Sequence, residues 1–134
     1  MIEVKTRWIR EQQFAAESGS GHRVLIDAEK KTAASPMELV LVGLCGCTAS
    51  DVVTILGKKR QPWTSLEIRA EAERAPNPPA VFTAIHLTYR VGGKVAPKAV
   101  EDAVRLSEEK YCSVAAMLRK TAKISYAIEY SEAS

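Results

Sequence analysis

The chain has 134 residues, enough for one domain with a substantial core, and its net charge of +3 is too small to indicate a nucleic-acid partner. Its hydrophobic fraction of 46% and charged fraction of 26% are those of an ordinary globular protein. The charged, alternating residues at 1–5 predict no signal peptide, and we expect the charge-free segment at 39–50 to be too short to span a membrane. We therefore expect a cytoplasmic protein that binds neither nucleic acid nor membrane.

The N-terminal part predicts three strands. From Ile2 to Trp8, apolar and charged residues alternate, which is typical of a half-buried strand. Residues 14–17 and 22–27 predict two more strands, and the turn residues at 18–21 separate them. A polar connection at 29–34 follows.

A long helix is predicted from Ser35 to about Arg60. Ser35 suits the N-cap, Pro36 suits the first helical position, and Glu38 stands where a capping box needs an acid. The segment 39–50 carries no charge, and a helix that is apolar on every side must be surrounded by protein. We therefore expect this helix to be the buried centre of the fold.

The remaining residues predict a hairpin, two helices and a last strand. Alternating patterns mark strands at 65–73 and 81–91, and a proline-rich loop joins them. Pro97 opens an amphipathic helix, a short apolar helix follows at 114–118, and 123–130 alternates again. This order predicts a single α+β domain over residues 1–134, with antiparallel sheets and helices packed on one face.

Two cysteines lie within the charge-free part of the long helix. Cys45 and Cys47 point about 200° apart, so they cannot both line one small site or form a disulfide with each other. Leucines flank Cys45, which we interpret as a core residue. Cys47 has polar neighbours within one turn, among them Thr48 and Asp51.

The third cysteine, Cys112, directly precedes the short apolar helix. Backbone N–H groups at a helix start lower the pKa of a thiol, and the nearby Glu109 and Lys110 indicate that Cys112 is not deeply buried. Cysteines in two different helices can meet in space, as a peroxidatic and a resolving thiol must. The two histidines, His22 and His86, are interpreted as surface or turn residues, and we expect no metal and no cofactor.

Three motifs resemble the OsmC/Ohr family, and most closely its YhfA-like branch. They are Ser-Pro-Met-Glu-Leu at 35–39, Cys-Thr-Ala-Ser-Asp-Val-Val at 47–53 and Glu-Lys-Tyr-Cys-Ser-Val at 109–114. The resemblance spans nearly the whole chain. It implies an OsmC-like fold, in which antiparallel sheets pack around the central helix of an intertwined homodimer. It also implies that Cys47 is the peroxidatic cysteine and Cys112 the resolving one.

One position departs from the peroxidases of that family. Those members carry a glutamate directly after the proline that opens the helix, and it pairs with an arginine that activates the thiol. Here that position is Met37, and Glu38 follows it, turned by about 100° around the helix. The arginine corresponds to Arg10 by its spacing from the turn at 18–21. The resemblance therefore makes Arg10 and Glu38 catalytic candidates beside the two cysteines.

Two hypotheses about function follow. The first is a cysteine-based peroxidase in oxidative stress defence, which reduces organic hydroperoxides and is recycled by a dithiol reductant. The second is a non-enzymatic, redox-sensing or small-ligand-binding dimer of the same fold. The cysteine pair favours the first hypothesis, and the methionine at position 37 favours the second.

Overall fold

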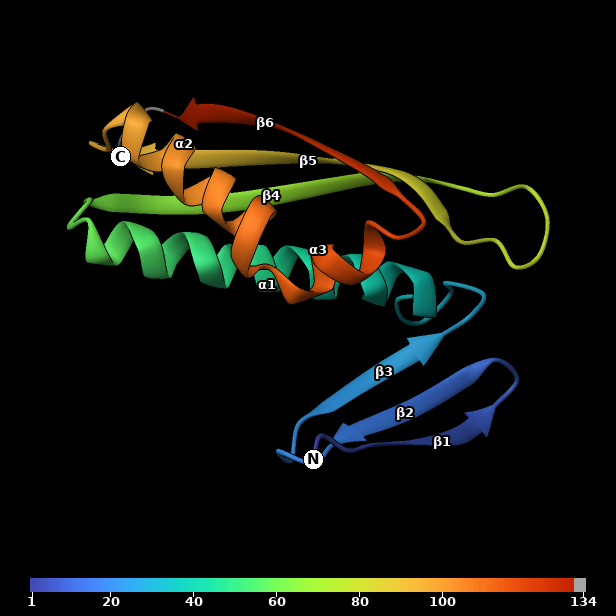
Figure 1. Cartoon of the computed structure of the whole chain (residues 1–134). Helices are drawn as coiled ribbons and strands as arrows, with labels where there is room; N and C mark the ends of the chain where they lie inside the picture. The colour runs from blue at the N-terminus through green and yellow to red at the C-terminus, as the bar shows by residue number, and fades with distance from the viewer. Residues whose placement is uncertain (132–134) are drawn as a thin grey trace. The chain divides into compact units, whose positions relative to one another are not determined.

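The structure is a computed structural model that describes residues 1–131. The chain forms two compact units, one from Met1 to Val42 and the other from Gly43 onward. Each unit is built around its own three-stranded sheet. Figure 1 shows both sheets and the helices that accompany them.

The first unit is an antiparallel sheet that leads into a helix start. Its strands β1 (Val4–Arg10), β2 (Gln13–Ser18) and β3 (Arg23–Asp27) pair in sequence order, as the alternating pattern predicted. Gly21 turns the chain between β2 and β3 with a φ of 88°, which glycine adopts at no steric cost. Every residue of β1 is exposed, so the first unit does not cover the half-buried face predicted for this strand.

The loop after β3 is organised by a buried carboxylate. Asp27 is 2% exposed and accepts hydrogen bonds from the backbone N–H groups of Glu29, Lys31 and Thr32, and from the Thr32 hydroxyl. Burial alone raises the pKa of Asp27, but these donors outweigh it and hold the pKa below its ordinary value. The loop ends at the predicted capping box, which Ser35 and Glu38 form. The Ser35 N–H donates to Glu38 Oε1 over 2.8 Å, and the Glu38 N–H donates to Ser35 Oγ over 3.2 Å.

The long helix, α1 (Pro36–Lys58), runs from the first unit into the second. Within the second unit the chain buries only one stripe of this helix: Leu44, Thr48, Val52 and Leu56. The burial on all sides expected from its composition is therefore not supplied by this chain alone. By length and hydropathy α1 could also cross a membrane, a test that the core helix of a soluble protein passes equally well.

The second unit packs helices against a mixed sheet. Strands β4 (Trp63–Arg74) and β5 (Phe82–Gly93) form the predicted antiparallel hairpin, and β6 (Lys123–Ser131) pairs with β5. Gly93 has a φ of 110°, and a Cβ there would lie 2.6 Å from the Pro62 carbonyl oxygen. Only glycine fits this end of β5.

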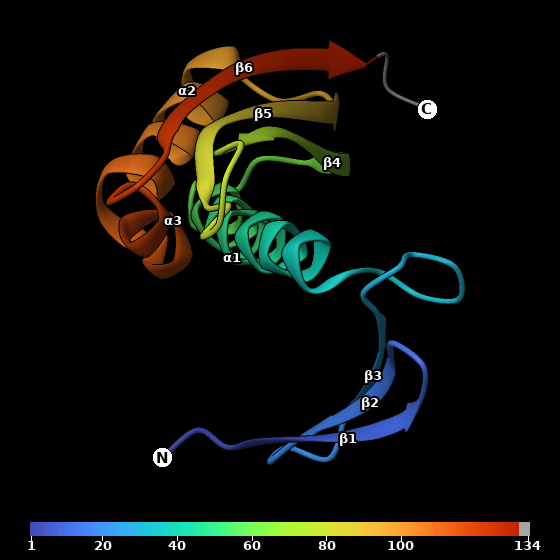
Figure 2. The same cartoon turned by 90° about the vertical axis from the view of Figure 1, so that its right-hand side faces the viewer.

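The pairing of β6 corrects one expectation. The sequence predicted antiparallel sheets, but β6 runs parallel to β5. The connection between them explains the difference. It contains α2 (Pro97–Leu106), the π-helical turn η1 (Ser107–Tyr111) and α3 (Ser113–Leu118), long enough to carry the chain back to the starting end of β5. Figure 2 shows α2 and α3 beside the sheet in this crossover.

The core of the second unit lies between β5, α1 and α2. The buried apolar side chains of these elements repeat every second residue on the strand and every three or four residues on the helices, as their patterns predict. They include Leu44, Val52, Leu56, Ile85, Leu87, Tyr89, Val91, Val100, Ala103 and Val104.

Candidate functional site

The second unit carries all three cysteines, and all three are free thiols. Cys45 and Cys47 lie on α1, and each is half-buried within the chain. Their spacing on a regular helix separates their directions by about 200°, as predicted. Burial raises the pKa of the Cys45 thiol, but Cys45 is only half-buried and does not belong to the core that the described residues form, as its sequence neighbours had predicted it would.

Cys112 stands between η1 and α3 and is 3% exposed, so the prediction that it is not deeply buried is wrong. Its Sγ accepts the N–H of Ala115 over 3.4 Å, which makes the thiol the N-cap of α3. The predicted lowering of its pKa is also wrong. Burial raises the pKa of Cys112 to about 12, although the Ala115 N–H works in the opposite direction. A six-residue helix supplies too little compensation for the lost water.

The fold brings Cys47 and Cys112 together from segments 65 residues apart in the sequence. A hydrogen bond and the charge of Cys47 both raise the pKa of the Cys112 thiol further, and the charge of Asp51 adds to them. Such an influence on Cys112 requires that these side chains be its neighbours. Cys47 and Cys112 are therefore placed as one thiol pair.

A buried polar network adjoins this pair. Thr48 Oγ1 lies 2.7 Å from both Tyr89 Oη and Ser107 Oγ. Ser107 Oγ donates to Asp51 Oδ2 over 2.8 Å, and Tyr89 Oη donates to a carboxylate oxygen of Glu108 over 2.6 Å. Arg119 Nη2 completes the network by donating to the other carboxylate oxygen of Glu108 over 2.8 Å.

Sequence reasoning noticed Thr48 and Asp51 but missed the rest of this network. Burial raises the pKa of Tyr89 far above its ordinary value, and its bond to the Glu108 carboxylate adds to the effect. Glu108 is 4% exposed. A signal was present, because Glu108 continues the inner-face spacing of Val100 and Val104, where a solvent-exposed charge does not belong.

The two other predicted site residues, Arg10 and Glu38, lie in the first unit. Glu38 is engaged in the capping box, and the Ser35 backbone N–H, followed by the Ser35 hydroxyl, holds the pKa of Glu38 below its ordinary value. Arg10 ends β1, and its guanidinium lies 3.5 Å from the Gln13 side-chain oxygen. Within residues 1–131, Arg10 forms no ion pair.

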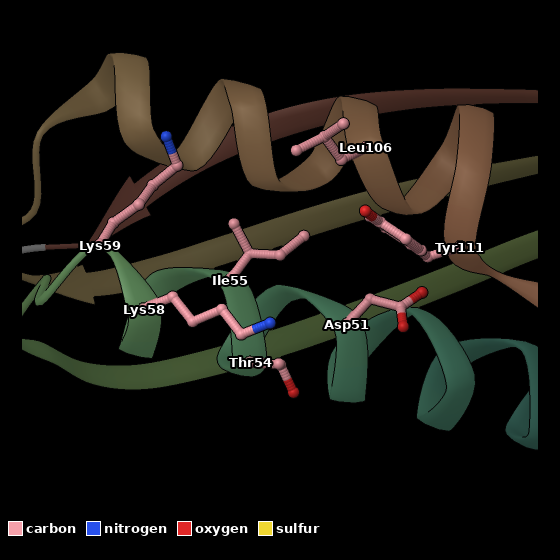
Figure 3. A pocket seen from close by; sticks show the side chains of 7 residues that line it. All are labelled: Asp51, Thr54, Ile55, Lys58, Lys59, Leu106 and Tyr111. Atoms are coloured by element: carbon pink, nitrogen blue, oxygen red, sulfur yellow. The ribbon is translucent and has the colours of Figure 1, made fainter.

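A cavity of about 410 Å³ opens beside Asp51 in the second unit. Its lining combines apolar side chains with two lysines: Asp51, Thr54, Ile55, Lys58, Lys59, Leu106 and Tyr111. Figure 3 shows these side chains projecting from α1, from Lys59 directly after it, and from the segment that contains α2 and η1. The cavity has room for a small, partly apolar molecule; neither cysteine lines it, and Asp51, one helical turn from Cys47 on α1, connects it with the site.

No three histidine, cysteine or acidic side chains among residues 1–131 gather where they could hold a metal ion. Both histidine rings instead lie close to serine hydroxyls, His22 to Ser20 and His86 to Ser125. The chemistry that the site offers is that of its thiols and the proton-bearing groups around them.

Fold and site together define an α+β protein in which a long helix and a later helix start each contribute one cysteine to a thiol pair. The OsmC-like protein family model matches residues 28–127, and the chain belongs to that family. The chain is 42% identical to protein YhfA of Escherichia coli K12 over 130 residues, which cover 96% of this chain and 97% of YhfA.

Solved structures show the same fold. A hypothetical protein from Aquifex aeolicus VF5 is 34% identical and superimposes with a TM-score of 0.85, covering 98% of each chain. The organic hydroperoxide resistance protein OhrB of Bacillus subtilis is 15% identical, with a TM-score of 0.66 over 96% of this chain and 98% of OhrB. The similarity to OhrB concerns the fold.

Proposed function

We propose that this protein is a cysteine-based peroxidase that reduces organic hydroperoxides in oxidative stress defence, with Cys47 as the peroxidatic and Cys112 as the resolving cysteine. The observation that carries the proposal is the pairing of Cys47 with Cys112 in the second unit. Membership of the OsmC-like family, which includes proteins named for organic hydroperoxide resistance, supports it. The partly apolar cavity beside Asp51 suits a hydroperoxide with an apolar tail.

The proposed reaction has two steps. The Cys47 thiolate attacks the terminal oxygen of the hydroperoxide, the O–O bond breaks, and the alkoxide leaves as an alcohol after it takes up a proton. Cys47 is then a sulfenic acid. The Cys112 thiol condenses with it, so that a disulfide forms and one water molecule is released. A dithiol reductant restores both thiols by exchange.

Arg10 and Glu38 remain proposed members of the catalytic machinery through the resemblance alone. A homodimer is also proposed, because the apolar residues of β1 and most of α1 lack cover within the chain. We also propose a cytoplasmic location, where a dithiol reductant can recycle the enzyme.

One observation favours the alternative, a non-enzymatic, redox-sensing or ligand-binding dimer. Met37 occupies the position of the activating glutamate, and Glu38 is engaged by Ser35 in the helix cap. Under this alternative the thiols would oxidise slowly, and reversible disulfide formation would itself be the signal.

Stopped-flow oxidation of the reduced protein separates the two functions. A peroxidase for organic substrates reacts faster with tert-butyl hydroperoxide than with hydrogen peroxide, and Cys47→Ser abolishes the reaction whereas Cys45→Ala does not. Peptide mapping after one equivalent of peroxide is expected to show a Cys47–Cys112 disulfide and a reduced Cys45. A dominant Cys45–Cys112 disulfide, or equally slow oxidation by both peroxides, contradicts the proposed function.

A further inference from the structure

The polar network beside the thiols contains fewer protons than its contacts need. Its four oxygen–oxygen contacts join Asp51 to Ser107, Ser107 to Thr48, Thr48 to Tyr89, and Tyr89 to Glu108, all at 2.6–2.8 Å. Each contact of this length needs one proton between its oxygens. With both carboxylates ionised, three hydroxyl groups supply only three protons.

The shortfall falls on one contact. Tyr89 donates to Glu108 and Ser107 donates to Asp51, so the Thr48 hydroxyl has a single proton for its contacts with Tyr89 and Ser107. One further proton on Asp51 removes the conflict. Asp51 then donates to Ser107, Ser107 donates to Thr48, Thr48 donates to Tyr89, and every contact is a hydrogen bond.

The end of the network that would receive this proton is next to the thiols. Asp51 follows Cys47 by four residues on α1, which places the two side chains one above the other on the same face of the helix. The charge of Asp51 also reaches Cys112. Ser107 is also held next to Cys112 in the chain, because its backbone oxygen accepts the Cys112 N–H over 2.8 Å.

The opposite end of the network is balanced by charge. Glu108 is buried and accepts from Arg119, whose positive charge compensates the carboxylate there. The additional proton therefore belongs at the Asp51 end, where no arginine or lysine forms an ion pair within residues 1–131.

We propose that Asp51 accepts the proton released when Cys47 ionises, and that Ser107, Thr48 and Tyr89 are positioning residues that stabilise Asp51 in its protonated form. This inference deepens the proposed function and rests on it for its biological purpose. The proton moves from Cys47 Sγ to Asp51, the thiolate attacks the hydroperoxide, and Asp51 returns the proton to the departing alkoxide. The network ends the step with the protons it had at the start.

An internal acceptor leaves a signature in the pH dependence of thiol reactivity. Between the two macroscopic pKa values of a coupled pair, the two groups together hold one proton. The fraction of molecules with the Cys47 thiolate beside protonated Asp51 therefore does not change with pH in that range. Alkylation of Cys47 by iodoacetamide, followed by peptide mass spectrometry, should therefore level off from about pH 7 to about pH 5.5 rather than fall tenfold per pH unit.

Asp51→Asn separates this role from that of a fixed charge, because the asparagine accepts a hydrogen bond but no proton. We expect the level region to disappear in this variant, so that the alkylation rate falls tenfold for each pH unit. If Asp51 is only a fixed negative charge near the thiols, the wild type itself falls tenfold per unit and Asp51→Asn alkylates faster at every pH. That result overturns the inference.

Two further variants complete the experiment. Glu109→Gln removes an exposed acid from the same π-helical turn and should leave the pH profile unchanged. Ser107→Ala keeps both carboxylates but breaks the network. It removes two hydrogen bonds when Asp51 is protonated, from Asp51 to Ser107 and from Ser107 to Thr48, but only one when Asp51 is ionised, so it should lower the level region about tenfold. Ser107→Ala also provides the decisive measurement if Asp51→Asn does not fold; an unaltered level region in Ser107→Ala contradicts the role of the network.

The other groups that line the cavity with Asp51 and could titrate or carry charge are Tyr111, Lys58 and Lys59. Tyr111→Phe and Lys58→Met should retain the level region, and its loss in either variant would assign the proton to that group instead. Iodoacetamide requires no peroxide chemistry. If the protein reduces no hydroperoxide but shows the level region, the proposed function is wrong and this inference stands. If it reduces hydroperoxides without showing the level region, only this inference is wrong.

Discussion

At the scale of single residues, Met37 tests how the thiol is activated. Met37→Glu restores the carboxylate that the peroxidases of the family carry after the helix-opening proline, while Glu38 stays in its cap with Ser35. We expect the second-order rate with tert-butyl hydroperoxide to rise about tenfold, which corresponds to about 1.4 kcal/mol in the transition state. Met37→Gln is the uncharged control. If Glu38→Ala abolishes turnover and Met37→Glu changes nothing, Glu38 is the activating carboxylate.

Asp27 predicts a pH dependence of stability that is separate from the thiols. Its folded-state pKa is lowered because the donors around it outweigh its burial, so its ionised form stabilises the fold. This contribution is complete above the unfolded pKa of about 3.9 and disappears as the pH falls through the lower folded value. Melting temperatures of wild type and Asp27→Asn should therefore differ at pH 6 and converge toward about pH 3. A difference independent of pH would contradict this account.

At the scale of secondary-structure elements, the ion pair of Glu108 with Arg119 joins η1 to the end of α3, the two elements that flank Cys112 in the chain. Removing one partner leaves the other without compensation, so Glu108→Ala should lower the free energy of unfolding by about 3 kcal/mol. Glu109→Ala, one residue along and exposed, should change it by less than about 0.5 kcal/mol. Chemical denaturation measures both, and equal effects of the two substitutions would exclude a special role for the buried pair.

The elements themselves were largely predictable, because periodicity and caps are local properties. The alternation in β4 and β5, the Ser35–Glu38 capping box and the inner face of α2 all correspond to the structure. The parallel direction of β6 was not predictable, since alternation is the same for both directions. Cys112 was misjudged for a related reason: charged neighbours in the sequence say little about burial where a π-helical turn rotates the chain.

The network escaped prediction because its members come from α1, β5, η1 and the end of α3. Tyr89 looks unremarkable in its own strand. Glu108 stands at an inner-face position of its helix, but its segment alone does not show which residues it meets. Cys47 and Cys112 could be paired in advance through the family resemblance alone.

At the scale of the whole molecule, the apolar helix α1 needs a partner that covers its exposed side. Only 22% of its most apolar 18-residue window is buried within the chain, although the helix has a mean hydropathy of 2.0 over that window. Within the second unit its exposed face carries small residues at helical spacing: Gly43, Gly46, Ser50, Thr54 and Gly57. Small side chains allow another element to approach a helix closely. A second copy of the chain is the partner that the proposed homodimer supplies.

Gly46 allows this dimer to be tested without disturbing the monomer fold. A Cβ added at Gly46 would meet no atom of residues 1–131 within 4 Å, and leucine is a better helix former than glycine by about 0.8 kcal/mol. Gly46→Leu should therefore leave the isolated chain folded but place a bulky side chain where a second copy packs. We expect wild type and Gly46→Ala to be dimers by light scattering at micromolar concentration, and Gly46→Leu to dissociate there with unchanged far-ultraviolet circular dichroism. A monomeric wild type contradicts the proposed dimer, and a Gly46→Leu variant that stays dimeric excludes this face of α1 from the interface.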